Sequence, residues 1–148
     1  MAEHRGGDRR ARVPHRVMCR DIAEQAVQAA QAKATELGIT MSVAVVDESG
    51  NLVYFVRGDT CSFHTFDTAR GKAVAAAAFR RPTHDMQEGY RSNPAFWAGL
   101  AAQLGLVPGD GGHPLTRDGV MIGGIGCGGG IGEEDHLCSE AGARAINT

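Results

Sequence analysis

The sequence has few aromatic residues, little excess of charge of either sign, and no long apolar run. Aromatic residues make up 5% of the 148 residues, so the core must be built from alanine, valine, leucine and isoleucine. A membrane helix needs a run of about 18 apolar residues, and because none is present we expect no membrane span. The formal net charge of -2 gives no reason to expect nucleic acid as a partner.

The cysteines and the N-terminus indicate a reducing compartment. The four cysteines are widely spaced and include no CxxC pair, which argues against a disulfide framework. The first 14 residues are rich in arginine and lack the apolar stretch of a secretory signal. We therefore expect a disordered basic tail over residues 1–14 and a single cytoplasmic domain over residues 15–148.

Glycine, in contrast, is abundant and unevenly distributed. Of the 21 glycines, twelve lie between Gly105 and Gly132. Glycine permits backbone conformations and close approaches that other residues do not, and such backbone often surrounds a ligand. The last third of the chain is therefore predicted to form a glycine-rich pocket.

Apolar periodicity predicts an α+β domain with a mainly antiparallel sheet and helices packed on it. The helices are expected over residues 15–37, 62–79, 85–91, 93–104 and 133–146. The strands are expected over residues 41–46, 52–57, 115–116 and 120–126. Residues 106–114 are predicted to be a loop, because glycine and proline are frequent there.

Three segments, in this order, resemble parts of a known family. They are SVAVVDESGNLVYFVRGD over residues 42–59, DTARGKAVAAAAFRRPT over residues 67–83 and GGHPLTRDGVMIGGIGCGGGIGEED over residues 111–135. The first is similar to the family's strand-turn-strand segment, the second to its alanine-rich helix, and the third to its glycine-rich segment before the last helix. The family is the GlcG/HbpS group of haem-binding proteins, which includes the C-terminal module of PduO-type proteins.

The resemblance implies a profilin-like three-layer α/β/α fold with a central antiparallel sheet. It also implies a homo-oligomer that binds haem or a related tetrapyrrole, with a role in iron or haem handling. The sequence departs from the family pattern at His113, where an apolar residue is usual, and at Cys127, which begins an altered glycine loop.

His113 carries the strongest functional signal of any single residue. It lies in a Gly-Gly-His-Pro segment, which we interpret as a rigid turn that opens onto a cavity. A neutral imidazole can ligate haem iron or another metal, or act as a general base near neutral pH. The alternative is an ordinary histidine of a surface loop.

Lys72 and Arg57 are the candidate partners of a ligand carboxylate. Lys72 lies in the alanine-rich helix, where its ammonium could hold a propionate; we favour a structural ion pair with Asp47 or Asp67. Arg57 ends a strand and could bind a carboxylate through two hydrogen bonds, or pair with Asp59.

The other candidate ligand-binding residues lie at a helix start or in the glycine-rich segment. They are Gly112, Pro114, Cys127 and His64, together with Asp47 in the first hairpin turn. His64 and Cys61 could form a nucleophilic pair at the start of a helix, although no third residue orients them. Cys127 could act as a thiolate, but inert burial is the interpretation that we favour.

Two further motifs are interpreted as structural. The segment GIGCGG over residues 124–129 matches G-x-G-x-x-G, but no parallel βαβ unit follows, so we exclude a dinucleotide site. Glu133 and His136 have the Glu-x-x-His spacing of di-iron bundles, which need two copies of the motif and two more glutamates.

Two functional hypotheses follow. The first is binding of haem or a related tetrapyrrole, with His113 as the axial ligand and Arg57 or Lys72 at the propionates. The second is a cofactor-independent isomerase, lyase or hydrolase on a small carboxylated or aromatic substrate, with His113 as general base and Lys72 or Arg57 positioning the substrate. A purely structural oligomer subunit is a third option. In each case the alanine-rich helix faces favour a homo-oligomer.

Overall fold

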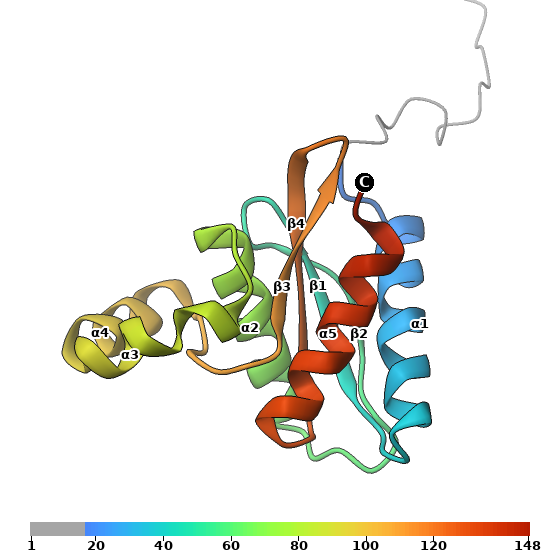
Figure 1. Cartoon of the computed structure of the whole chain (residues 1–148), viewed down its shortest axis with the longest axis horizontal. Helices are drawn as coiled ribbons and strands as arrows, with labels where there is room; N and C mark the ends of the chain where they lie inside the picture. The colour runs from blue at the N-terminus through green and yellow to red at the C-terminus, as the bar shows by residue number, and fades with distance from the viewer. Residues whose placement is uncertain (1–16) are drawn as a thin grey trace, which may run out of the picture.

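The protein is a three-layer arrangement in which helices cover both faces of one sheet (Figure 1). The computed structural model describes residues 17–148, so the predicted tail over residues 1–14 and the predicted helix start at residue 15 lie outside it. The strands are antiparallel and follow the order β2-β1-β4-β3. Their bounds are β1 Ser42–Asp47, β2 Leu52–Val56, β3 Gly112–Arg117 and β4 Val120–Gly128.

The helices divide unequally between the two faces of the sheet. Helix α2 packs against one face, while α1 and α5 pack side by side on the other (Figure 1). The segment from α3 to α4 extends away from the sheet. The helices are α1 Arg20–Glu36, α2 Thr65–Phe79, the 3-10 helix η2 Thr83–Met86, α3 Gln87–Ser92, α4 Pro94–Leu104 and α5 Gly132–Ile146.

Helix α2 lies unusually close to strands β3 and β4, because both surfaces lack large side chains. A Cβ atom at Gly124 would overlap the carbonyl oxygen of Ala73, and one at Gly126 would overlap that of Ala69. A Cβ atom at Gly112 would meet the backbone of α2 in the same way. The alanines of α2 and the glycines of β3 and β4 therefore form one close interface. A larger residue at these glycines would push the helix away from the sheet.

The opposite face of the sheet carries the large apolar side chains. Because side chains alternate along a strand, Ile125 and Cys127 point away from α2 and toward α1 and α5. Both are fully buried. The alanine stripe of α1, which includes Ala26 and Ala30, packs in the same core. The alanine-rich faces thus serve packing between layers of one chain.

The structure corrects the predicted loop over residues 106–114. Residues 112–114 belong to strand β3, where His113 pairs with Ile125 and Pro114 pairs with Gly124. Proline is tolerated because β3 is an edge strand, so its missing N–H interrupts no ladder. Strand β4 also continues to Gly128, beyond the predicted end at residue 126.

The remaining elements agree with the sequence patterns to within a few residues. The first hairpin and the last three helical segments occur where they were predicted. Residues 17–19 are not helical, so the first helix begins later than predicted. The four cysteines are free thiols, as their spacing indicated. Within residues 17–148, no helix combines the length and the apolar character needed to cross a bilayer.

We expect Gly126→Ala to lower the free energy of unfolding by about 1–3 kcal/mol or more, because the added methyl group overlaps the backbone of α2. Gly89→Ala in α3 is the matched control, since a Cβ atom there would make only ordinary van der Waals contact with Trp97, at 3.6 Å or more. The control should raise stability by about 0.5–1 kcal/mol. Urea denaturation measures both, and wild-type stability in Gly126→Ala would contradict the close approach.

Candidate functional site

Two groups of polar side chains lie on either side of the first turns of α5. One surrounds Lys72 and Asp135 next to the glycine loop, and the other surrounds His113 and His136 between β3 and α5. The two groups differ in exposure and in chemistry.

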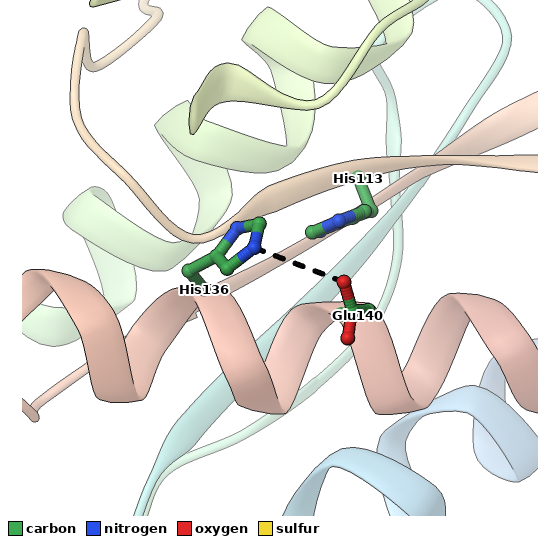
Figure 2. A group of neighbouring side chains, drawn as sticks. All are labelled: His113, His136 and Glu140. Carbon is green, nitrogen blue, oxygen red and sulfur yellow. Dashed lines mark ion pairs between the residues drawn. The ribbon is translucent and has the colours of Figure 1, made fainter. Parts of the chain in front are cut away.

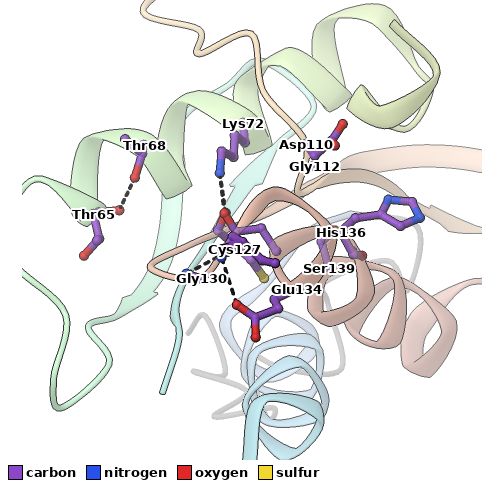
Figure 3. Close-up of polar contacts among 12 residues, drawn as sticks. Thr65, Thr68, Lys72, Asp110, Gly112, Cys127, Gly130, Glu134, His136 and Ser139 are labelled. Atoms are coloured by element: carbon purple, nitrogen blue, oxygen red, sulfur yellow. Dashed lines mark hydrogen bonds and ion pairs between the residues drawn. The ribbon is translucent and has the colours of Figure 1, made fainter. Parts of the chain in front are cut away.

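Lys72 and Asp135 form a buried ion pair that joins α2 to α5. The Nζ atom of Lys72 donates to Oδ2 of Asp135 at 2.9 Å and to the carbonyl oxygen of Cys127 at 3.0 Å (Figure 3). The predicted pairing of Lys72 with Asp47 or Asp67 is wrong. Asp67 is exposed and pairs with Arg70 one helical turn away, whereas Lys72 faces the sheet.

The carboxylate of Asp135 is held from two sides. Its Oδ1 atom accepts a hydrogen bond from the backbone N–H of Gly130 at 2.9 Å. Burial raises the pKa of Asp135, while the hydrogen bonds from Lys72 and Gly130 act in the opposite direction. Breaking this pair would leave an uncompensated buried charge. The pair therefore holds the glycine loop against α2.

A pocket of about 310 Å³ opens above this ion pair. It is lined by Thr60, Cys61, Ser62, His64, Thr65, Thr68, Lys72, Gly129, Gly130 and Asp135. His64 is exposed, just before the first turn of α2. The sulfur atom of Cys61 lies 3.9 Å from the Thr40 carbonyl oxygen, and across residues 17–148 no hydrogen bond joins it to His64. A Cys–His nucleophile is therefore not assembled here.

His113 lies in a different environment from the one predicted. Its side chain is buried, with the residue 7% exposed, and its Nδ1 atom is 2.7 Å from Oγ of Ser139 on α5. Burial and the neighbouring His136 lower its pKa to about 4. The predicted rigid turn is a strand, and since Gly112 faces α2, strand alternation directs His113 to α5.

His136 and Glu140 complete the second group. The Nε2 atom of His136 lies 3.8 Å from Oε2 of Glu140, one turn along α5, and the ring centroid of His113 lies 5.0 Å from that of His136 (Figure 2). The ring centroid of His84 lies 4.5 Å from that of His136, with the two ring planes tilted by 35°. Sequence reasoning did not single out Glu140 or Ser139, although the four-residue spacing of His136 and Glu140 indicates one helical face.

The other predicted ligand residues have separate roles. Arg57 is exposed after β2 and lines a neighbouring pocket of about 300 Å³. Asp47 accepts hydrogen bonds from the backbone N–H groups of Ser49 and Asn51, both at 2.9 Å, and so closes the first hairpin. Neither Arg57 nor Asp47 therefore belongs to the group of side chains around His113.

The remaining predicted ligand residues, Gly112, Pro114 and Cys127, lie in strands β3 and β4 and have structural roles. The N–H of Gly112 donates to Oγ1 of Thr83 at 2.9 Å, and Pro114 follows in the same strand. Burial raises the pKa of the Cys127 thiol well above its usual range, so it stays protonated at neutral pH. Cys127 contributes its carbonyl oxygen to Lys72, and its inert side chain agrees with the interpretation favoured from sequence.

The sequence as a whole matches a known family. Residues 18–144 match the family described as haem degrading protein HbpS-like. The chain belongs to the HbpS-like family. GlcG of Escherichia coli K12 is 31% identical over 110 residues, which cover 74% of this chain and 80% of GlcG. The predicted resemblance to the GlcG/HbpS group is confirmed.

Solved structures of HbpS-like proteins share the whole fold. A double mutant of HbpS from Streptomyces reticuli has 30% identity and a TM-score of 0.80, covering 97% of this chain and 94% of that one. The structure of a PduOC–haem complex has 29% identity and a TM-score of 0.78, covering 88% and 96%. The predicted α/β fold with an antiparallel sheet is therefore confirmed.

We expect the stability of the metal-free protein to fall at acid pH because of His113. Its pKa is lowered from 6.5 to about 4 by folding, so the unfolded chain binds a proton between these values that the folded chain does not. This contribution is complete above pH 6.5 and is lost as the pH falls toward 4. Between pH 7 and pH 5 the loss is about 2 kcal/mol.

The measurement is urea denaturation with a chelator present, on wild type and on His113→Gln, which removes the titrating imidazole. The stability difference between the two proteins should shrink by that amount at pH 5. A difference that is the same at both pH values would contradict the buried neutral imidazole.

Proposed function

We propose that this chain binds haem or a related tetrapyrrole at the pocket between the start of α2 and the glycine loop. The observation that carries the proposal is the PduOC–haem complex, which shares this fold over 88% of the chain. The pocket adds support, because it combines an exposed histidine, a buried lysine and several hydroxyl groups. We further propose a role in iron or haem handling, in the cytoplasm.

His64 is the favoured axial ligand of the haem iron. It is exposed at the pocket, so the space over its ring is open to a flat macrocycle. His113, the ligand favoured from sequence, is 7% exposed and enclosed by Ser139 and His136. A macrocycle could reach His113 only if α5 moved away from the sheet.

Exposed apolar side chains beside the pocket suit the faces of a macrocycle. Phe63, next to His64, is 79% exposed, and Ile131, next to Gly130, is 67% exposed. Neighbouring exposed apolar residues at a polar pocket favour a ligand that covers them. Bound haem would supply redox chemistry at its iron.

Lys72 and the hydroxyl groups suit the carboxylates of a tetrapyrrole. The Lys72 ammonium has three N–H groups, and its two hydrogen bonds go to Asp135 and to the Cys127 carbonyl. The third N–H can serve a carboxylate in the pocket, together with the hydroxyls of Thr60 and Ser62. Here the lysine is both a structural partner of Asp135 and a candidate ligand contact.

We expect hemin added to the purified protein to give a saturable shift of the Soret band. His64→Ala should weaken hemin binding about 10-fold or more, because it removes the iron ligand. His113→Gln is the control and should bind hemin as the wild type does. No saturable shift in the wild type would refute haem binding, whereas a loss confined to His113→Gln would return the ligand role to His113.

We also propose that the protein is a homo-oligomer in which a second copy covers α4. None of the 11 residues of α4 is buried, although the helix is largely apolar. Phe96 is 55% exposed and Leu104 is 47% exposed. The alanine-rich faces of α1 and α2 are covered within one chain, so α4 is the better candidate for an interface.

Light scattering should give a mass that is a multiple of 15.5 kDa for the wild type. Phe96→Ser with Leu104→Ser should shift the mass toward one chain, because both changes remove apolar contact area. Val120→Ser, at an exposed position on the β3–β4 hairpin, is the matched control and should leave the mass unchanged. A monomeric wild type would refute this proposal.

A further inference from the structure

The histidine group on the α5 side of the sheet contains a compact set of metal ligands. One ligand atom from each of His113, His136 and Glu140 lies within 4.8 Å of the other two. Figure 2 shows His113 entering from β3 above the two side chains of α5. Two imidazoles and one carboxylate are a common donor set for zinc and for non-haem iron(II).

We propose that His113, His136 and Glu140 bind one divalent transition-metal ion, such as Zn²⁺ or Fe²⁺. This site is separate from the tetrapyrrole pocket, since none of its three residues lines that pocket. It also does not depend on the tetrapyrrole proposal, because it rests on two residues of α5 and on His113, which faces α5.

The hydrogen bonds around His113 leave the correct nitrogen free for a metal. The hydroxyl of Ser139 donates to the His136 carbonyl oxygen at 3.0 Å, which uses its only proton. In this arrangement the Ser139 oxygen, 2.7 Å from His113, accepts from Nδ1. The Nε2 atom of His113 then carries the lone pair, and the ring is oriented as second contacts orient metal-bound histidines.

His136 provides an independent sign of a missing partner. Its Nδ1 atom is buried and has no hydrogen-bond partner among residues 17–148. Buried polar atoms are nearly always satisfied, so an unpaired ring nitrogen beside two other metal ligands requires an explanation. An ion would bind either this nitrogen or Nε2, which faces Glu140, and only in the first case would it satisfy Nδ1.

Glu140 is positioned from the side opposite to the histidines. Its Oε1 atom pairs with Arg144 at 3.3 Å, while Oε2 faces His136 at 3.8 Å. One carboxylate oxygen is therefore left for an ion. His84 lies beside His136 and 3.4 Å from Asp110, so it covers the cluster from outside. Three protein ligands would leave coordination positions for water or a small donor molecule.

Calorimetric titration of the chelator-treated full chain with ZnCl₂ tests the proposal. The parent protein for the titration carries His64→Ala and Cys61→Ser, which remove the accessible ligands of the other pocket. We expect one ion per chain. Glu140→Gln should lower the affinity at least about 10-fold, and Ser139→Ala about 10-fold with the stoichiometry unchanged. Glu48→Gln, at an exposed glutamate of the β1–β2 turn, is the matched control and should bind as the parent does.

The test variants change one buried and one half-buried polar group without adding volume, so circular dichroism and urea denaturation should show folded protein. Wild-type affinity in Glu140→Gln and Ser139→Ala would refute the site and leave the cluster as a helical ion pair beside a core histidine. Co²⁺ gives a second readout, because a thiolate-to-cobalt charge-transfer band would locate the ion at a cysteine and also refute the site. Hemin binding by Glu140→Gln should equal that of wild type, so the metal and tetrapyrrole proposals fail independently.

Discussion

The close contact between α2 and the sheet is the constraint on which the other features depend. Glycines on one face of β3 and β4 allow the backbone of α2 to approach until only hydrogen atoms fit between them. At this distance Lys72 can extend past the end of β4 and reach Asp135 at the start of α5. A single ion pair thereby connects the helical layers on opposite sides of the sheet.

Side chains alternate between the two faces of the sheet, so glycines lie on one face and the histidine cluster lies on the other. Gly112 and His113 are consecutive, and one faces α2 while the other faces α5. Asp135 and His136 are also consecutive, and they belong to the pocket and to the histidine cluster respectively. The residue pairs 112–113 and 135–136 therefore each contribute to two chemically different groups, one on either side of the sheet.

Local patterns predicted much of the fold, since helix periodicity and the Asp47 turn depend on residues close in the sequence. The family resemblance identified the glycine-rich segment before the last helix correctly. Strand β3 was missed because Gly-Gly-His-Pro has the composition of a turn, and only its position at the sheet edge makes a strand acceptable. The environment of His113 was mispredicted for the same reason, because a turn does not fix the direction of a side chain as strand alternation does.

The Lys72–Asp135 pair could not be predicted, because its members are 63 residues apart and local acids offered nearer partners. Glu140 was within reach of sequence reasoning, as its spacing from His136 is helical. Its proximity to His113 required the packing of α5 on β3.

The adjacency of Asp135 and His136 has a mechanical consequence. Both side chains are fixed to the first turns of one helix, so a rotation of α5 about its axis moves the two groups together. If an occupant of either group turned α5, it would also change the affinity of the other group for its own occupant. By thermodynamic linkage the factor is the same in both directions.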